Sequence, residues 1–171
     1  MAQTFTLYYP GIAFAAGKNM AAIINTHASE VLKVRRVGLL NTQTAAVTGV
    51  ICQLDLQYRP SAGLTGHTTI SPVAHDSTNS APASAIYGHA GTPTGTAYTL
   101  RRVFWSSDEP AISAATLDEL ECLVPFNIIW DAGYGDSNVQ PLTLRQNDGM
   151  FLYNQTGAAG IVDIWIEFTK E

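Results

Sequence analysis

Hydrophobic and polar residues alternate along three stretches of the chain, and this period of two predicts strands with one buried face. The stretches are Thr48–Arg59, Ile161–Thr169 and Asp118–Val124. Their apolar faces carry Val50, Cys52, Leu54, Leu56 and Tyr58, then Val162, Ile164, Ile166 and Phe168, and finally Leu120, Cys122 and Val124. Each face is expected to line a core, with Gln53, Asp55, Gln57, Arg59 and their equivalents on the opposite, solvent side.

Five further segments, rich in β-branched or aromatic residues, are also predicted to be strands. They are Phe5–Tyr9, Val31–Leu40, Ala97–Trp105, Leu142–Gln146 and Met150–Gln155. Asn147-Asp148-Gly149 joins the last two and is typical of a type I turn followed by a left-handed glycine, which predicts a hairpin. A turn at Gly157–Gly160 then leads into the last strand, so the final third is expected to be a meander.

Evidence for helices is limited to Asn19–Asn25 and Ser113–Glu119, which could form a turn or two. Neither segment sustains an apolar period of 3.6 residues. The predicted fold is therefore all-β, an antiparallel β-sandwich resembling a jelly roll with little helix. Residues 1–171 are expected to form one domain, with residues 1–28 left open as an N-terminal arm.

The segment Pro60–Thr96 is dominated by small and polar residues, Pro and His. A structureless loop of that length is uncommon in a compact domain, so short strands are predicted at Thr68–Ser71 and Ser84–Tyr87. Pro72–Pro82 and Gly88–Gly95 are expected to be surface loops between them, where a partner protein could bind.

The composition favours self-association. Charged residues make up only 13% of the chain, about half the usual share, although the hydrophobic content of 46% is ordinary. Because free surfaces are rich in charge and interfaces are depleted of Lys, Glu and Asp, we expect an oligomer. The net charge of −5 and the scattered arginines argue against direct binding of nucleic acid. The apolar stretch Pro10–Asn25 is too short to span a bilayer, so no membrane association is expected.

One tripeptide suggests an enzyme, but only weakly. Gly135-Asp136-Ser137 resembles the sequence around the nucleophile of several serine hydrolases. The similarity ends at Asn138-Val139, and these residue types are typical of a turn between strands. We therefore expect no catalytic residue and no enzymatic activity.

The remaining polar residues do not form a recognisable metal or cofactor motif. His27, His67, His75 and His89 are widely spaced, and Asp76 beside His75 lies in a loop sequence. The carboxylates at Asp108-Glu109 and Glu119–Glu121 are explained by solvated turns and strand edges. Cys52 and Cys122 lack a CxxC spacing and are expected to be reduced and buried. No metal and no cofactor are predicted.

Aromatic residues are the better candidates for a functional surface. Trp165 falls on the polar face of the last predicted strand, and Phe151 and Tyr153 fall opposite Met150 and Leu152. Aromatic residues are enriched at the centres of protein interfaces, although a covering strand or loop would explain them equally well. The interface candidates are Phe5, Tyr8, Tyr9, Phe151, Tyr153 and Trp165, of which the first three either dock on their own sheet or reach a neighbouring subunit.

The later part of the chain resembles the small jelly-roll decoration, or cement, proteins that bind outside the icosahedral capsids of tailed phages. The matching residues are Arg101–Trp105 with Ser106–Pro110, Trp130–Asp136, Pro141–Arg145, Gly149, Gly157, Gly160 and the closing Asp163–Phe168. The similarity covers roughly the last seventy residues, with a weaker echo in Val31–Tyr58. Alternating strands joined by glycine turns also occur in other β-sandwiches.

The resemblance implies a homotrimer that is made in the host cytoplasm, binds the major capsid protein on the virion surface and stabilises the shell. It carries over no catalytic residue. The alternative is a tail fibre or spike module that binds a receptor or a glycan, with Trp165 or Tyr134 stacking on sugars. Hydrolysis at Ser137 is a third hypothesis.

Overall fold

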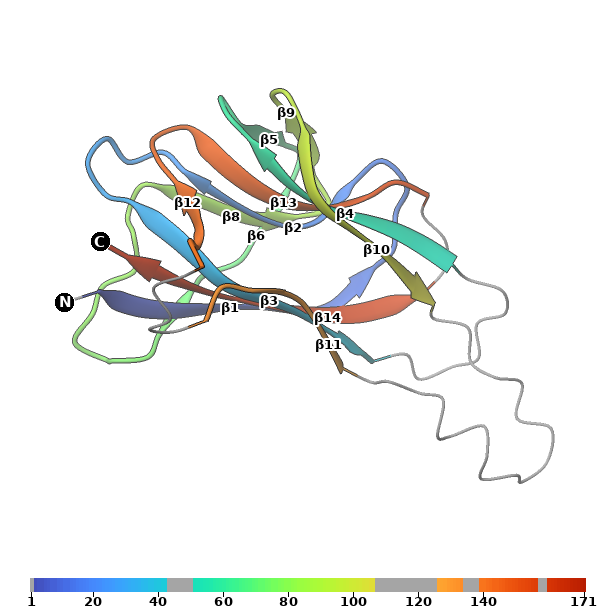
Figure 1. Ribbon diagram of the computed structural model, residues 1–171, viewed down its shortest axis with the longest axis horizontal. Helices are drawn as coiled ribbons and strands as arrows, with labels where there is room; N and C mark the ends of the chain where they lie inside the picture. The colour runs from blue at the N-terminus through green and yellow to red at the C-terminus, as the bar shows by residue number, and fades with distance from the viewer. Residues whose placement is uncertain (1, 43–50, 107–125, 134–138, 157–159) are drawn as a thin grey trace, which may run out of the picture.

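The computed structural model describes residues 2–42, 51–106, 126–133, 139–156 and 160–171, and every regular element in these ranges is a β-strand (Figure 1). The first sheet, sheet A, has the order β11 (Phe126–Asp131), β3 (Leu32–Asn41), β14 (Ile161–Lys170), β1 (Gln3–Ala13) and β7 (Val73–Ala74), with β12 (Leu142–Leu144) also paired to β3. Sheet B has the order β10 (Tyr98–Ser106), β4 (Ile51–Arg59), β13 (Asp148–Asn154), β2 (Asn19–Asn25), β8 (Ala85–His89) and β6 (Thr68–Thr69). A third, two-stranded sheet pairs β5 (Gly63–Thr65) with β9 (Thr92–Thr94).

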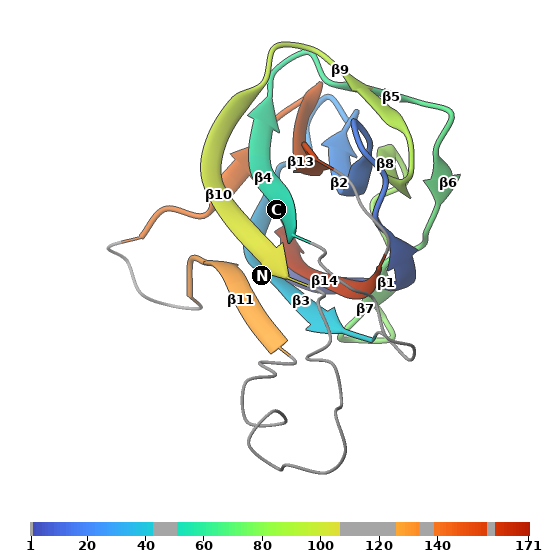
Figure 2. The same cartoon turned by 90° about the vertical axis from the view of Figure 1, so that its right-hand side faces the viewer.

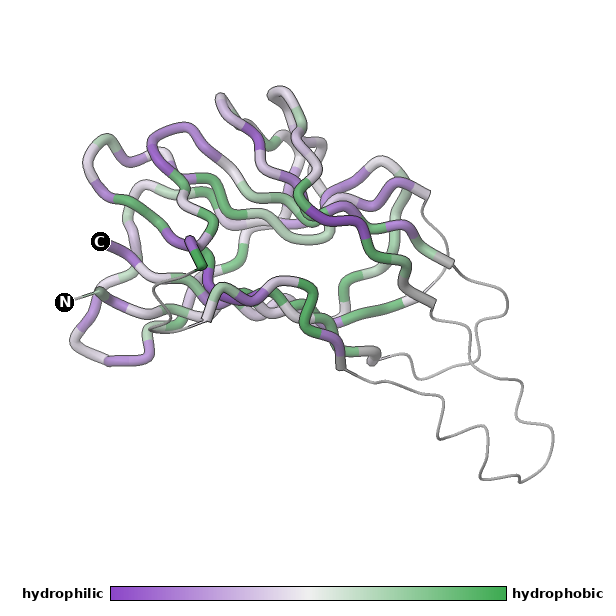
Figure 3. Tube along the Cα trace, in the orientation of Figure 1, coloured by the Kyte–Doolittle hydropathy of each residue, from purple (hydrophilic) through white to green (hydrophobic). Residues whose placement is uncertain are grey.

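Sheets A and B face each other and enclose one hydrophobic core, so the predicted antiparallel β-sandwich is confirmed (Figure 2). The alternation along β14 places Val162, Ile164, Ile166 and Phe168 in this core, all fully buried. Cys52, Leu54 and Leu56 of β4 lie opposite them and are also buried. Figure 3 shows the pattern as hydrophobic and hydrophilic bands that alternate along the strands.

The strand β2 corrects the expectation of a helical turn at Asn19–Asn25. All seven residues of this strand are buried. Ala21 and Ile23 face the main core, whereas Ala22 and Ile24 belong to a second apolar cluster on the outside of sheet B. A strand covered on both faces has no polar face, and its sequence therefore lacks the alternation that marks a half-buried strand.

That second cluster exists because β5 and β9 form a ribbon, the β5–β9 ribbon, over the outer face of sheet B (Figure 1). Leu64 of β5 packs there with Ala22, Ile24 and Phe151. The ribbon lies within the segment Pro60–Thr96. Strands β7 and β9 fall in the two parts of this segment that were predicted to be loops. Short strands near Thr68–Ser71 and Ser84–Tyr87 are present as β6 and β8.

The predicted hairpin and meander at the end of the chain are wrong. A turn does join β12 to β13, with the Asp148 amide donating to the Arg145 carbonyl oxygen at 2.9 Å. The left-handed residue is Asn147, with φ of 65°, rather than Gly149. The two strands belong to different sheets, because β12 pairs with β3 whereas β13 lies between β2 and β4. The chain then returns to sheet A in β14, so these strands cross between sheets instead of forming a meander.

No N-terminal arm extends from the described part of residues 1–28. Strand β1 pairs with β14 from Gln3 to Ala13, and β2 lies inside sheet B. The described part of residues 1–28 therefore belongs to the two sheets of the domain and does not form a separate arm. Cys52 is buried as predicted. The predictions for Asp118–Val124, Ser113–Glu119 and Cys122 lie outside the described residues.

Candidate interaction surfaces

Three of the six interface candidates are wrong, because Phe5, Tyr9 and Phe151 are fully buried within the subunit. Phe5 stacks on Phe168 with ring centroids 5.4 Å apart, and the Tyr9 hydroxyl donates to the carbonyl oxygen of Ala22 at 2.9 Å. Phe151 lies on the outer face of sheet B, as predicted, but the β5–β9 ribbon covers it. In each case the chain itself supplies the apolar partner.

Tyr153, a fourth candidate, is half-buried on the same outer face. Its ring lies 5.6 Å from the guanidinium carbon of Arg59, which is 5.4 Å from the Phe151 ring. The Arg59 guanidinium also donates to Gln57 Oε1 at 2.8 Å and to the Gly95 carbonyl oxygen at 3.1 Å. Gln57 and Arg59 of β4, which were predicted to face solvent, thus form a buried polar layer beneath the ribbon.

The remaining two candidates, Tyr8 and Trp165, lie side by side on the outer face of sheet A. They are register partners on β1 and β14, and the same line continues through Gly38 on β3 to Ile128 on β11. Tyr8 is 48% exposed and Ile128 is 43% exposed, while Trp165 is half-buried. We call Tyr8, Trp165, Gly38 and Ile128 the aromatic row.

Gly38 determines how Trp165 lies in this row. A Cβ atom at position 38 would fall 2.4–2.8 Å from three atoms of the indole ring. Real Cβ atoms do not approach other atoms so closely, so only glycine lets the indole lie down across β3. Trp165 therefore covers the sheet instead of standing out into solvent.

Asp163 holds Tyr8 in position at one side of the row. Its carboxylate, 7% exposed, accepts hydrogen bonds from the Tyr8 hydroxyl, from the Gly11 amide at 2.6 Å and from Thr42 Oγ1 at 3.0 Å. Burial alone would raise the pKa of Asp163, but these donors outweigh it and lower the pKa. The carboxylate is therefore ionised at neutral pH and raises the pKa of Tyr8 through their hydrogen bond.

Charged residues occupy the next line across sheet A, on the other side of the aromatic row. Glu167 of β14 pairs in register with Arg36 of β3, which pairs with Asp131 of β11. Arg36 Nε lies 3.2 Å from a carboxylate oxygen of Asp131. The aromatic row is thus bordered by Asp163 on one side and by this charged line on the other.

A second exposed surface, which sequence reasoning missed, follows strand β10. Tyr98 is 54% exposed, Leu100 is 43% exposed and Phe104 is 69% exposed. We call these three residues the β10 edge, because β10 is the last strand of sheet B and pairs with β4 alone among the described strands. The signal in the sequence was the interruption of alternation at Leu100, where the register to β4 shifts.

Two arginines on β10 are committed to the fold. Arg102 donates to both carboxylate oxygens of buried Asp55, at 2.7 and 3.0 Å. Burial would raise the pKa of Asp55, but hydrogen bonds from Arg102 and Gln155 lower it below the usual value. Arg101 donates to the Ile129 carbonyl oxygen at 2.9 Å and so joins β10 of sheet B to β11 of sheet A (Figure 2).

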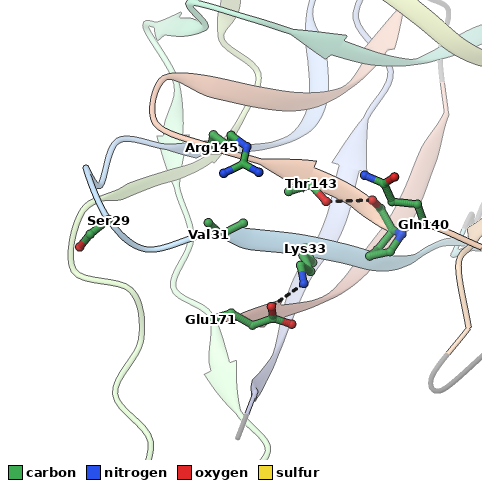
Figure 4. Close-up of a pocket in the computed structure, with 8 residues that line it drawn as sticks. Ser29, Val31, Lys33, Gln140, Thr143, Arg145 and Glu171 are labelled. Carbon is green, nitrogen blue, oxygen red and sulfur yellow. Dashed lines mark hydrogen bonds and ion pairs between the residues drawn. The ribbon is translucent and has the colours of Figure 1, made fainter. Parts of the chain in front are cut away.

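A shallow pocket of about 570 Å³ lies where β12 meets the start of β3 (Figure 4). It is lined by Ser29, Val31, Lys33, Gln140, Pro141, Thr143, Arg145 and Glu171. Lys33 forms an ion pair with Glu171, and the Thr143 hydroxyl donates to the Pro141 carbonyl oxygen at 3.1 Å. The lining is mostly polar, and the one charged pair within it is formed by Lys33 and Glu171.

The histidines and acidic residues are not gathered into a site within the described ranges. His75 Nε2 lies 2.7 Å from Thr6 Oγ1, and His89 packs against Tyr9. Across the part of the chain that the structure describes, no three His, Cys, Asp or Glu residues are placed to share a metal ion. In the same part, no helix is long and apolar enough to cross a bilayer. Gly135-Asp136-Ser137, Tyr134, Asp108-Glu109 and Glu119–Glu121 lie outside it.

Searches against protein-family models, curated proteins and solved structures found no match to this chain.

Proposed function

We propose that this chain is a non-enzymatic structural subunit of a virus particle. In this proposal it associates into a homotrimer, binds the major capsid protein outside an assembled capsid and stabilises the shell. The observation that carries the proposal is the β10 edge, where three large apolar side chains are exposed along the last strand of a sheet.

The order of the strands supports a jelly roll, the fold of the proteins that the chain resembles. The eight long strands are, along the chain, β1, β2, β3, β4, β10, β11, β13 and β14. In sheet A the first, eighth, third and sixth of these lie side by side, and in sheet B the second, seventh, fourth and fifth. Every pair of successive strands except β4 and β10 thus lies in different sheets, and this order is what two interleaved Greek keys produce.

The β10 edge supports self-association for two reasons. An edge strand presents unpaired backbone groups to another chain, and native monomers usually protect such edges with Lys, Pro or a short length. Strand β10 spans nine residues, Tyr98–Ser106, and carries neither Lys nor Pro. It does carry a register shift at Leu100 and two arginines, but Arg101 and Arg102 are hydrogen-bonded within the subunit. Its large side chains, Tyr98 and Phe104 above all, would supply apolar contact area at a subunit interface.

Stabilisation of a shell then follows from linkage. A subunit that binds the assembled lattice and not the free capsid protein shifts the equilibrium toward assembly by mass action. A trimer that contacts the lattice through three copies of a weak site gains avidity without any stronger single contact. The low charge of the chain suits burial of a large share of its surface.

Immunogold labelling of intact particles tests the location. The proposal predicts label spread over the capsid surface, and extraction of the protein should lower the temperature at which the particles release DNA. Re-addition of the purified chain should restore that temperature. Label confined to the tail, or particles whose heat stability is unchanged by extraction, would contradict the proposal.

A further inference from the structure

The pocket where β12 meets the start of β3 is held in shape by backbone pairing. Thr143 and Lys33 are register partners on these two strands. Just before β3 begins, Val31 and Glu171 exchange both of their backbone hydrogen bonds, at 2.9 and 3.0 Å. The side chains on these segments therefore project from fixed positions, which lowers the entropy that binding a ligand would cost.

Donors outnumber acceptors among the described side chains that line this pocket. The side chains that can donate a hydrogen bond are Ser29, Lys33, Gln140, Thr143 and Arg145. The carboxylate of Glu171 only accepts, and Lys33 already pairs with it. A ligand that fills the pocket must therefore supply acceptor oxygens.

One cation in the lining is uncommitted. Glu171 lies between two cations, because Lys33 pairs with one of its carboxylate oxygens and Arg35 Nη2 lies 3.8 Å from the other. The Arg145 amide donates to Asp148 Oδ2 at 3.0 Å. Among the described residues, however, no hydrogen bond or ion pair involves the exposed Arg145 guanidinium, which is directed into the pocket (Figure 4).

The other charges nearby are matched within the subunit. Glu30, which follows Ser29, lies 3.7 Å from Lys170. Further along sheet A, Arg36 pairs with Asp131, and its register partner on β14 is Glu167. The pocket thus offers a single uncommitted positive charge, which suits a ligand with one negative charge.

The shape of that charge favours a carboxylate. The guanidinium of Arg145 is planar and can donate two parallel hydrogen bonds to a planar carboxylate. A phosphate with two negative charges would need a second cation, and Lys33 is already paired with Glu171. The negative charge of Asp148, on the same turn as Arg145, also disfavours a doubly charged ligand.

The size and the remaining lining favour a sugar that carries the carboxylate. A volume of about 570 Å³ is typical of small-molecule sites and far exceeds the need of a bare ion. The apolar part of the described lining is limited to Val31 and Pro141, which can meet the C–H face of one pyranose ring. The large apolar side chain of a peptide terminus would instead be placed against polar groups.

We propose that this pocket binds an acidic sugar, a uronate or sialate unit, with its carboxylate on the Arg145 guanidinium. Ser29, Gln140 and Thr143 hydrogen-bond to its ring and hydroxyl oxygens. The site is separate from the β10 edge and does not depend on the proposed capsid role, because neither the pocket nor its ligand involves that edge.

Ligand-observed NMR titration of the purified chain tests this directly. The probes are glucuronate, galacturonate and N-acetylneuraminate, with glucose, galactose and glucose 6-phosphate as comparisons. At least one acidic sugar should bind saturably, and glucose and galactose should bind at least about tenfold more weakly. Arg145→Ala should weaken binding of the acidic sugar about tenfold or more, whereas Arg145→Lys, which keeps the charge but loses the planar fork, should retain part of the affinity.

A matched control separates the site from a general effect of charge. Lys18→Ala also removes one positive charge, but Lys18 bonds to Thr92 on β9, outside the pocket, so the affinity should stay unchanged. The thermal midpoint of Arg145→Ala should equal that of the parent chain, which shows that the loss of binding is local. Absence of binding to all three acidic sugars would overturn the proposal. Equal affinity for the neutral sugars, tighter binding of glucose 6-phosphate, or affinity that survives Arg145→Ala would overturn it as well.

Discussion

Trp165 lies across the backbone of Gly38, its register partner on β3, where a Cβ atom would come within 2.4–2.8 Å of the indole. We predict that Gly38→Ala displaces the indole and lowers the free energy of unfolding by about 1–3 kcal/mol, the usual cost of overpacking. Urea unfolding measures the cost, and near-UV circular dichroism reports the altered indole environment.

The double variant Gly38→Ala/Trp165→Ala supplies the control for this contact. With the indole gone, the added methyl group has room, so the cost of Gly38→Ala measured against Trp165→Ala should largely vanish. An equal cost in both backgrounds would show that the backbone of β3, and not the indole, requires glycine.

Phe151 tests whether the β5–β9 ribbon is part of the folded core. Its ring is fully buried among Ala22, Ile24 and Leu64, so Phe151→Ala should lower the free energy of unfolding by about 3–5 kcal/mol. Tyr153→Ala, two residues along the same face and half-buried, should cost much less. Chemical denaturation of both variants gives the comparison, and similar small costs would mean that the ribbon does not pack on sheet B.

Arg59 links the ribbon to β4 through hydrogen bonds to Gly95 and Gln57 while it covers the rings of Phe151 and Tyr153. Arg59→Ala should lower the free energy of unfolding by about 2–3 kcal/mol, because the variant loses both the charge-assisted hydrogen bonds and the packing against the two rings. Arg145→Ala, an exposed arginine on the turn before β13, is the matched control and should be nearly neutral. A neutral Arg59→Ala would contradict the buried polar layer.

The Asp55–Arg102 pair should make stability depend on acid. Because the pKa of Asp55 is lower in the folded chain than its unfolded value of about 3.9, its contribution is complete above that pH and is lost as the pH falls through the folded pKa. Asp55→Asn should therefore be less stable than the parent chain at pH 7, and the difference should narrow below about pH 4. A difference that stays constant from pH 7 to about pH 3 would rule out this linkage.

Arg102→Ala tests the cause of that shift. Without Arg102, burial has more weight and the pKa of Asp55 should rise toward its unfolded value, so the variant should be less stable at pH 7 and should lose less of its stability in acid than the parent chain does. The measurement is the urea midpoint as a function of pH for both chains. Coincident pH profiles would mean that Arg102 does not set the pKa of Asp55.

The inner faces of the strands could be predicted from the sequence, because alternation records burial on one side. Residues such as Leu54 and Ile164 face the core as the pattern predicts. The outer faces could not be read in the same way. Arg59 looks solvated in the sequence, yet it is buried beneath a ribbon that comes from a segment without hydrophobic periodicity. Asp55 also looks solvated, yet it is buried where Arg102 and Gln155 bond to it. The residues Asn147-Asp148-Gly149 correctly predicted a turn, but a turn sequence does not indicate which sheet each flanking strand joins.

The candidate surfaces, too, could be predicted only as far as the local sequence pattern reaches. The polar-face position of Trp165 was readable from its neighbours Ile164 and Ile166, whereas its contact with Tyr8 depends on pairing between the two ends of the chain. Tyr9 and Phe151 were wrongly predicted to lie at an interface, because the residue type alone does not tell whether an aromatic side chain packs within its own subunit or against another. Burial of these residues is a tertiary property.

Light scattering coupled to size-exclusion chromatography, over a range of protein concentrations, tests the central claim that the β10 edge joins subunits. We predict an oligomer for the parent chain and a monomer for Leu100→Ser/Phe104→Ser. Val73→Ser, which alters an equally exposed apolar side chain on sheet A, should leave the oligomer intact. A monomeric parent chain, or an oligomer that persists in the Leu100→Ser/Phe104→Ser variant, would contradict the claim.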